Sequence, residues 1–120
     1  MIKSQKKNLD KLFQIAINNR DNECKKCKKQ QALNAHHLFS RARMNTRWDL
    51  DNGILLCAGC HVFSSLFSAH KTPRAFFRWI EEYKGKKWLD DLENRSQLTA
   101  KNLDYNLIRL YLEQEIKKNE

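Results

Sequence analysis

Apolar residues recur at helical spacing near the start of the chain. Residues 6–19 carry apolar side chains three or four positions apart, at Leu9, Leu12, Phe13, Ala16 and Ile17. This period places them on one face of an amphipathic helix. Residues 18–22, Asn-Asn-Arg-Asp-Asn, are polar turn formers, so we expect the helix to end there.

The middle of the chain has an extended pattern. Residues 33–39 predict a short strand, and residues 54–57, Ile-Leu-Leu-Cys, predict a short buried strand. The polar, Arg-rich residues 40–52 between them predict a loop. This loop leads into Asp51-Asn52-Gly53, a sequence typical of a turn. The two strands are therefore expected to form a hairpin.

Helical spacing returns after Ala58. Val62 and Leu66 are four residues apart, and so are Phe63 and Phe67, which predicts a helix that stops before Pro73. Three further helices are expected beyond it, over residues 73–84, 86–95 and 102–118. The first has Thr72 as N-cap, Pro73 at its first position, Gly85 at its end, and Phe76, Phe77, Ile80 and Tyr83 facing inward. In the last helix the predicted apolar stripe is Leu103, Leu107, Leu110 and Tyr111.

These elements predict a mostly helical α+β fold, in which helices flank a small hairpin. A chain of 120 residues suits one domain, with a soft boundary near Gly85. Residues 1–85 then hold the hairpin and the N-terminal helix. Residues 86–120 form a helical extension that packs on the same domain.

The net charge of +9 is unevenly distributed. Residues 1–35 have a balance of +6, residues 36–85 of +3, and residues 86–120 of zero. A basic face suggests a polyanionic partner, for which nucleic acid is the common case, although a solubilising surface charge remains an alternative. The neutral C-terminal helices are the expected place for a homodimer or partner-protein contact.

No run of about 18 apolar residues is present, so no membrane span is expected. The polar N-terminus has no signal-peptide pattern, which predicts a cytoplasmic protein in a reducing compartment. There, Cys24-x-x-Cys27 and Cys57-x-x-Cys60 favour a structural Zn²⁺ site over disulfides. Cys57 to His61 also matches a c-type haem motif, but haem attachment needs export and leaves the first cysteine pair unexplained.

Three histidines accompany the cysteines. His36 and His37 are neighbours on a predicted strand, so their side chains point to opposite faces. If strand and helix pack together, His36 and His61 can meet at one divalent cation, while a neutral His37 acts as general base on a water molecule. His70 is expected to be an ordinary histidine at a helix end. Asn52 either belongs to a simple turn or aims the His37 ring.

The order Ala35-His36-His37, Asn52 and Leu56-Cys57-Ala-Gly-Cys60-His61 resembles the HNH endonucleases, also called His-Me finger or ββα-metal nucleases. The resemblance covers roughly residues 20–80. It implies a zinc-stapled ββα-metal hairpin-helix core, with His36 and His61 on a catalytic cation and catalytic roles for His37 and Asn52. Family members often have Asp where this chain has His36, which adds Mn²⁺, Ni²⁺ and Zn²⁺ to Mg²⁺ as expected catalytic cations.

The resemblance implies hydrolysis of DNA phosphodiester bonds. The loop arginines Arg41, Arg43 and Arg47 are candidates to clamp phosphates, unless they are simply solvated. Residues 39–52 are also similar to phage recombination proteins of the NinG type, which suggests a phage or mobile-element origin and a bacterial host cell.

Two other functions remain open. One is a zinc-dependent nucleic-acid-binding module without catalysis, and the other is an accessory protein for recombination or packaging. The aromatic residues Phe76, Phe77, Trp79 and Trp88 are a base-stacking platform or, more commonly for such a stripe, part of the core.

Overall fold

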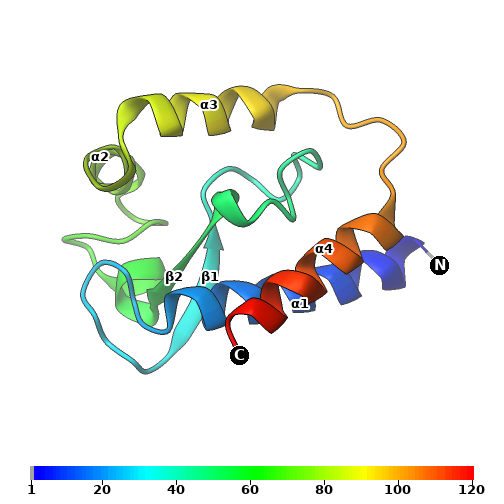
Figure 1. The fold of residues 1–120 in the computed structure, drawn as a ribbon. Coiled ribbons are helices and arrows are strands. Elements are labelled where there is room, and N and C mark those ends of the chain that lie inside the picture. The colour runs from blue at the N-terminus through cyan, green and yellow to red at the C-terminus, as the bar shows by residue number, and fades with distance from the viewer. Residues whose placement is uncertain (1) are drawn as a thin grey trace.

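The structure, a computed structural model, describes residues 2–120. It is mostly helical, with one small antiparallel sheet, which confirms the predicted fold class (Figure 1). The elements in chain order are α1 (Ile2–Asp21), β1 (Leu33–His37), the 3₁₀ turn η1 (Leu50–Asn52), β2 (Gly53–Cys57), the π-type turn η2 (Gly59–Phe63), α2 (Pro73–Lys84), α3 (Lys86–Gln97) and α4 (Tyr105–Lys118). In residues 2–120, none of the helices combines the length and apolarity needed to cross a bilayer.

The first helix confirms the predicted apolar face. Leu9, Phe13, Ala16 and Ile17 are all buried, although α1 is longer than the predicted residues 6–19. Asn22 ends it in the left-handed conformation, with φ of 64°, and donates its backbone N–H to the carbonyl of Asn18. Asparagine tolerates this conformation better than most residues.

The hairpin divides the core in two. In its register Ala35 lies opposite Leu55, and His36 lies opposite Ile54. Ala35 and Leu55 face the core cluster built on α1 and α4, while Ile54 belongs to the cluster that includes Phe76 of α2 and Leu92 of α3. Figure 1 shows α1 and α4 together on one side of the hairpin and α2 and α3 on the other. Each strand therefore aims alternate side chains at different helices.

The predicted helix after Ala58 is wrong beyond Phe63. Only η2 forms, and the chain then folds back, so that Ala69 N–H bonds to Cys60 O and His70 N–H bonds to His61 O. These two carbonyls are the acceptors that a continuing helix needs for its next turn. Phe63 and Leu66 consequently remain 70% and 91% exposed, and do not pack as a helical stripe.

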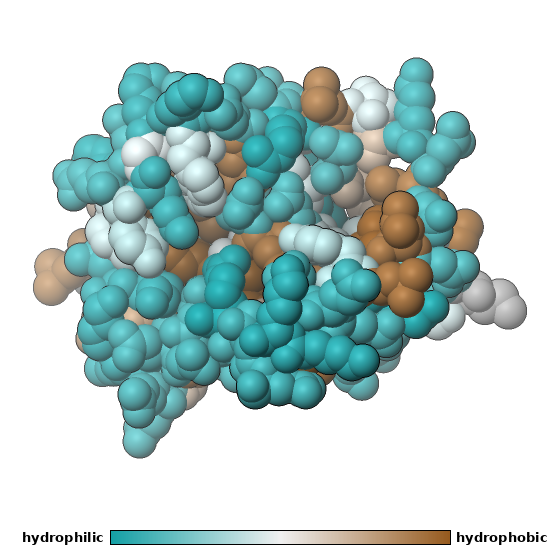
Figure 2. Space-filling model, in the orientation of Figure 1, coloured by the Kyte–Doolittle hydropathy of each residue, from teal (hydrophilic) through white to brown (hydrophobic). Residues whose placement is uncertain are grey.

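The helix α2 has the predicted bounds, whereas α4 begins at Tyr105 instead of the predicted residue 102, and the buried faces of both differ from the prediction. Phe76 and Ile80 of α2 are buried as predicted, whereas Tyr83 is 45% exposed. Of the predicted stripe, Leu103 packs against the α1 cluster just before α4 begins. The rest of the stripe is wrong, because the face of α4 packed on α1 consists of Tyr105, Ile108, Leu112 and Ile116. Figure 2 shows apolar side chains gathered over the start of α4, where Leu107 and Leu110 are exposed.

Candidate functional site

The four cysteines form one cluster between the turn after α1 and the end of the hairpin. Their Sγ atoms all lie within 4.8 Å of one another, and Cys27 Sγ is 3.5 Å from Cys57 Sγ. A tetrahedral site with Zn–S bonds of about 2.3 Å requires sulfurs about 3.8 Å apart. The cluster therefore has the donor chemistry and the spacing of a Cys₄ zinc site.

Backbone hydrogen bonds fix this arrangement. Cys24 N–H donates to Lys29 O at 2.8 Å, and Lys25 N–H donates to Leu55 O at 3.0 Å, which ties the turn to β2. Burial raises the pKa of the Cys24 thiol, but N–H groups of the turn and of Cys57 outweigh it and lower the pKa to about 7. Burial and the neighbouring Cys24 raise the pKa of Cys60. Four crowded sulfurs cannot all ionise without a cation, and a Zn²⁺ ion held by them would supply the charge that permits this.

A second cluster unites three histidines. Ring nitrogens of His36, His61 and His70 lie within 4.8 Å of one another, and Nε2 of His70 is 3.1 Å from Nε2 of His61. His36 comes from β1, His61 from η2, and His70 from the loop that folds back on η2. The ring nitrogens of His36 and His61 therefore lie close together, as predicted. His70, expected to be an ordinary histidine at a helix end, lies instead in a loop, and its ring is within reach of the other two histidines.

Two of the three rings, those of His36 and His61, are held in the neutral form by burial. Burial lowers the pKa of His36 to about 3, with a further contribution from the neighbouring histidines, and burial and His70 lower the pKa of His61. The His36 ring also packs edge-on against Phe76, at 5.1 Å between centroids. Neutral imidazoles offer lone pairs to a divalent cation, so the cluster fits a second metal.

His37 faces the opposite side of β1, as predicted. Its ring stacks on Phe13 of α1, with centroids 4.6 Å apart and an interplanar angle of 11°. Its Nε2 lies 2.9 Å from the carbonyl oxygen of Arg47, which accepts hydrogen bonds and cannot donate. Nε2 therefore carries the hydrogen, and Nδ1 has the free lone pair. Burial lowers the pKa of His37, which favours this neutral form.

Asn52 holds the loop that carries the Arg47 carbonyl. Its side chain is fully buried, accepts the backbone N–H of Phe39 at 2.9 Å, and donates to the carbonyls of Phe39 and Thr46, each at 3.1 Å. It makes no hydrogen bond to His37 among residues 2–120. Asn52 thus positions the ring indirectly, through the Thr46–Arg47 peptide.

The three loop arginines have different surroundings. Arg47 donates to both carboxylate oxygens of Asp10, at 3.0 and 2.6 Å, and is mostly buried. Arg43 donates to Ser96 Oγ at 2.9 Å. Arg41 is largely exposed, 3.5 Å from Asp10, and its charge contributes to lowering the pKa of His37. Arg41 and Arg43 are both exposed, and Arg41 is the exposed arginine whose charge acts on His37.

This geometry coincides with one family comparison. Residues 24–63 match the HNH endonuclease family model. The match covers about a third of the chain and associates that HNH region with nuclease and nucleic-acid-binding activity. No curated protein and no solved structure matches the chain.

The HNH match contains both cysteine pairs, His36, His37, Asn52 and His61, but it ends before His70. No local pattern in the sequence points to His70, because it lies nine positions after His61, a spacing that fits no single helical face. The backbone bonds that return the chain to η2 bring the two side chains together.

Proposed function

We propose that the protein is a metal-dependent DNA endonuclease that hydrolyses phosphodiester bonds, with His37 as general base. The tautomer of His37 is the observation that carries the proposal. A ring whose Nε2–H is held by the Arg47 carbonyl presents a basic Nδ1, and its lowered pKa keeps Nδ1 unprotonated near neutral pH. Nδ1 accepts a proton from water as the water oxygen attacks phosphorus.

The products follow from this step. A bond forms between the water oxygen and phosphorus, the bond from phosphorus to the 3′ oxygen breaks, and the leaving oxygen takes up a proton from solvent. One strand then ends in a 5′-phosphate and the other in a 3′-hydroxyl. The stack on Phe13 and the bond to Arg47 hold the His37 ring in one orientation throughout.

His36, His61 and His70 would hold the catalytic cation. When bound, a divalent cation there supplies Lewis-acid stabilisation of charge on the phosphate and the leaving oxygen. Three imidazoles favour Mn²⁺, Ni²⁺ or Zn²⁺ more than an oxygen-rich site does, although Mg²⁺ remains a candidate. The cysteine cluster would hold the structural Zn²⁺.

DNA as substrate is supported by the HNH match and by the charge of the chain. The excess positive charge lies in residues 1–85, which include every candidate metal ligand. Arg41, exposed beside His37, is the proposed phosphate contact, whereas Arg47 and Arg43 serve the loop structure. A role in phage recombination, suggested by residues 39–52, remains a separate hypothesis.

The deciding experiment is plasmid cleavage with added Mg²⁺, Mn²⁺ or no metal, comparing wild type with His37→Ala. We expect His37→Ala to lose cleavage while it keeps its zinc content, its fold and its DNA binding. Asn34→Ala is the matched control, because Asn34 lies on the same strand with an exposed side chain. An EDTA arm must be brief, since chelators also remove structural zinc.

Cleavage by His37→Ala at the wild-type rate would refute the assignment of the base. A wild-type protein that binds DNA but cleaves none with any of these metals would instead support the non-catalytic binding module.

A further inference from the structure

Lysines and aromatic rings alternate along the edge of the molecule formed by the cysteine turn, α2 and α3. We call the following residues the lysine–aromatic surface: Lys26, Phe67, Trp79, Tyr83, Lys84 and Trp88. All of them are at least partly exposed. Phe67, Trp79 and Trp88 also pack against the core, so each presents only part of its ring to solvent.

The contacts within this surface are regular. Lys26 Nζ lies 4.8 Å from the centre of the Phe67 ring and 5.9 Å from that of Trp79. Trp79 stacks on Tyr83 at 5.5 Å with an interplanar angle of 11°. Lys84 Nζ lies 5.1 Å from the Tyr83 ring and 5.4 Å from the Trp88 ring. The rings are thus held in place while the ammonium groups remain at the surface.

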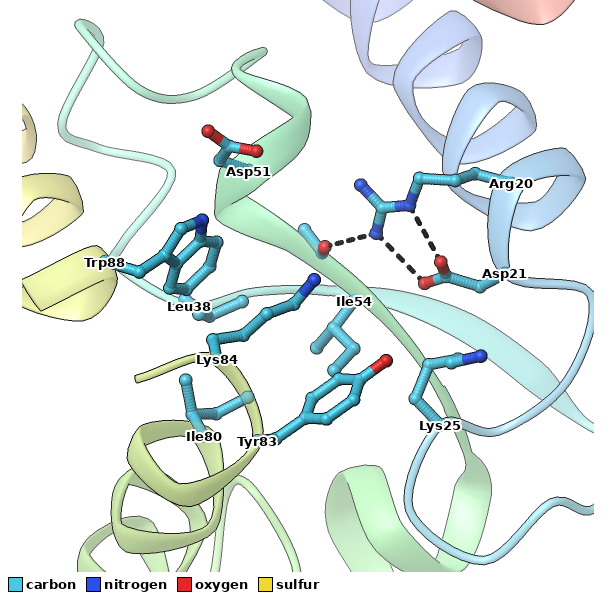
Figure 3. A pocket seen from close by; sticks show the side chains of 11 residues that line it. Arg20, Asp21, Lys25, Leu38, Asp51, Ile54, Ile80, Tyr83, Lys84 and Trp88 are labelled. Carbon is cyan, nitrogen blue, oxygen red and sulfur yellow. Dashed lines mark hydrogen bonds and ion pairs between the residues drawn. The ribbon is translucent and has the colours of Figure 1, made fainter. Parts of the chain in front are cut away.

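Part of this surface lines a cavity of about 30 Å³, shown in Figure 3. Tyr83, Lys84 and Trp88 line one side, and Arg20 and Asp21 come from α1. Asp21 is already paired with Arg20, at 2.7 Å. Within residues 2–120, neither Lys26 nor Lys84 has a carboxylate within ion-pair distance, so their charges are available to an external anion.

The surface is also close to the histidine cluster. Ring contacts of 5.1 and 6.0 Å lead from His36 through Phe76 to Trp79. If one phosphate of a DNA strand lies at the histidine cluster, nucleotides a few positions along that strand can therefore reach the lysine–aromatic surface.

We propose that the lysine–aromatic surface binds a single-stranded segment of DNA, so that the substrate contains unpaired nucleotides. Aromatic faces stack on bases only where the bases are free of their neighbours, and lysines contact phosphates without reading sequence. A duplex presents base edges and phosphates, and leaves these rings unused. This inference rests on the proposed nuclease for its biological meaning, but the binding it describes is measurable without cleavage.

The test uses the full-length, zinc-loaded His37→Ala protein without added catalytic metal. Labelled single-stranded and duplex DNA of equal length are titrated at one salt concentration, and binding is followed by anisotropy and tryptophan fluorescence. We expect tighter binding of the single strand, by about tenfold. Bound DNA should quench the fluorescence of Trp79 and Trp88, because Trp48 is buried. The Trp79→Phe variant should therefore show less fluorescence quenching while it still binds the DNA.

Tyr83→Ala should raise the Kd for the single strand by about fivefold or more, because the weakest base–aromatic stacks contribute about that factor to affinity. The Kd for duplex DNA should stay unchanged. Lys84→Ala should reduce the salt slope by about 0.7, the value for one phosphate of a single strand. Lys101→Ala, an exposed lysine between α3 and α4, is the matched control.

Equal affinity for duplex and single strand, or no effect of Tyr83→Ala, would overturn the inference and leave the nuclease proposal standing. Binding of a protein in preference to single-stranded DNA at this surface would also overturn it. Single-strand binding that depends on Tyr83, in a wild-type protein that cleaves no DNA, would sustain the inference and refute the proposed function.

Discussion

Replacing Gly53 by alanine tests how tightly α1 is pressed against the hairpin. A Cβ atom at Gly53 would lie 2.5 Å from Cζ of Phe13 and 2.8 Å from Cδ1 of Ile17. Both side chains are buried and have no solvent to move into. Gly53 itself has φ of −129°, an extended conformation that alanine adopts freely, so the effect is steric and not a matter of backbone strain.

The magnitude follows from two opposing terms. Forcing an extra methyl group into a packed core costs about 1–3 kcal/mol. The smaller conformational freedom of alanine in the unfolded chain offsets about 0.4–1 kcal/mol of this. We therefore expect the free energy of unfolding to fall by about 0.5–2.5 kcal/mol, or Tm by about 2–10 °C at this chain length.

Thermal and urea unfolding followed by circular dichroism measure this change. Gly59→Ala is the matched control, because its Cβ would meet only Cys57 Sγ, at an ordinary 3.9 Å. Cleavage should fall further than stability alone requires, since Phe13 supports the His37 ring. A Tm for Gly53→Ala equal to or above the wild-type value would refute the tight-packing argument.

Four other outcomes are expected. Cys57→Ser should lose zinc and unfold, because structural zinc binding contributes about 10–16 kcal/mol to such folds, and a folded, zinc-replete variant would contradict the Cys₄ site. Log affinity for duplex DNA should fall with log salt by about 0.9 per phosphate contacted, and a flat response would exclude DNA as the partner. His70→Ala should weaken Mn²⁺ binding in calorimetry by at least about tenfold with the zinc content unchanged, whereas equal affinity would remove His70 from the cation site. Burial raises the pKa of Asp10, but Arg47 and Trp48 outweigh it and hold that pKa below its usual value. Asp10→Asn should therefore destabilise the protein at pH 7. Its deficit should shrink as the pH falls through the lowered folded pKa of Asp10, and a pH-independent deficit would contradict the ion pair.

The chemistry-bearing residues were largely predictable from local patterns. Two CxxC pairs indicate a zinc site, because each pair places two thiols on one turn. The strand period predicted opposite directions for His36 and His37, and the structure shows His36 towards α2 and His37 towards α1. The bounds of α2 followed from Pro73 and Gly85, which act through their own backbone preferences.

Other features could not be predicted, because the local sequence is compatible with more than one arrangement. The α4 sequence contains two apolar stripes, and only the packing against α1 selects the one that includes Ile108 and Leu112. The ion pair of Arg47, a candidate phosphate ligand, with Asp10 at 2.6 Å was not predictable either, because the two residues are 37 positions apart.

For this protein, the sequence by itself determined which cysteines are available to bind a metal and in which direction each histidine of the hairpin points. Both are properties of bond geometry over a few residues. Only the tertiary structure decided that His70 joins His36 and His61, because backbone hydrogen bonds from Ala69 and His70 replace the helix that local spacing favoured. Contacts between distant segments have no period in the sequence, so the third histidine of the site became visible only in the folded chain.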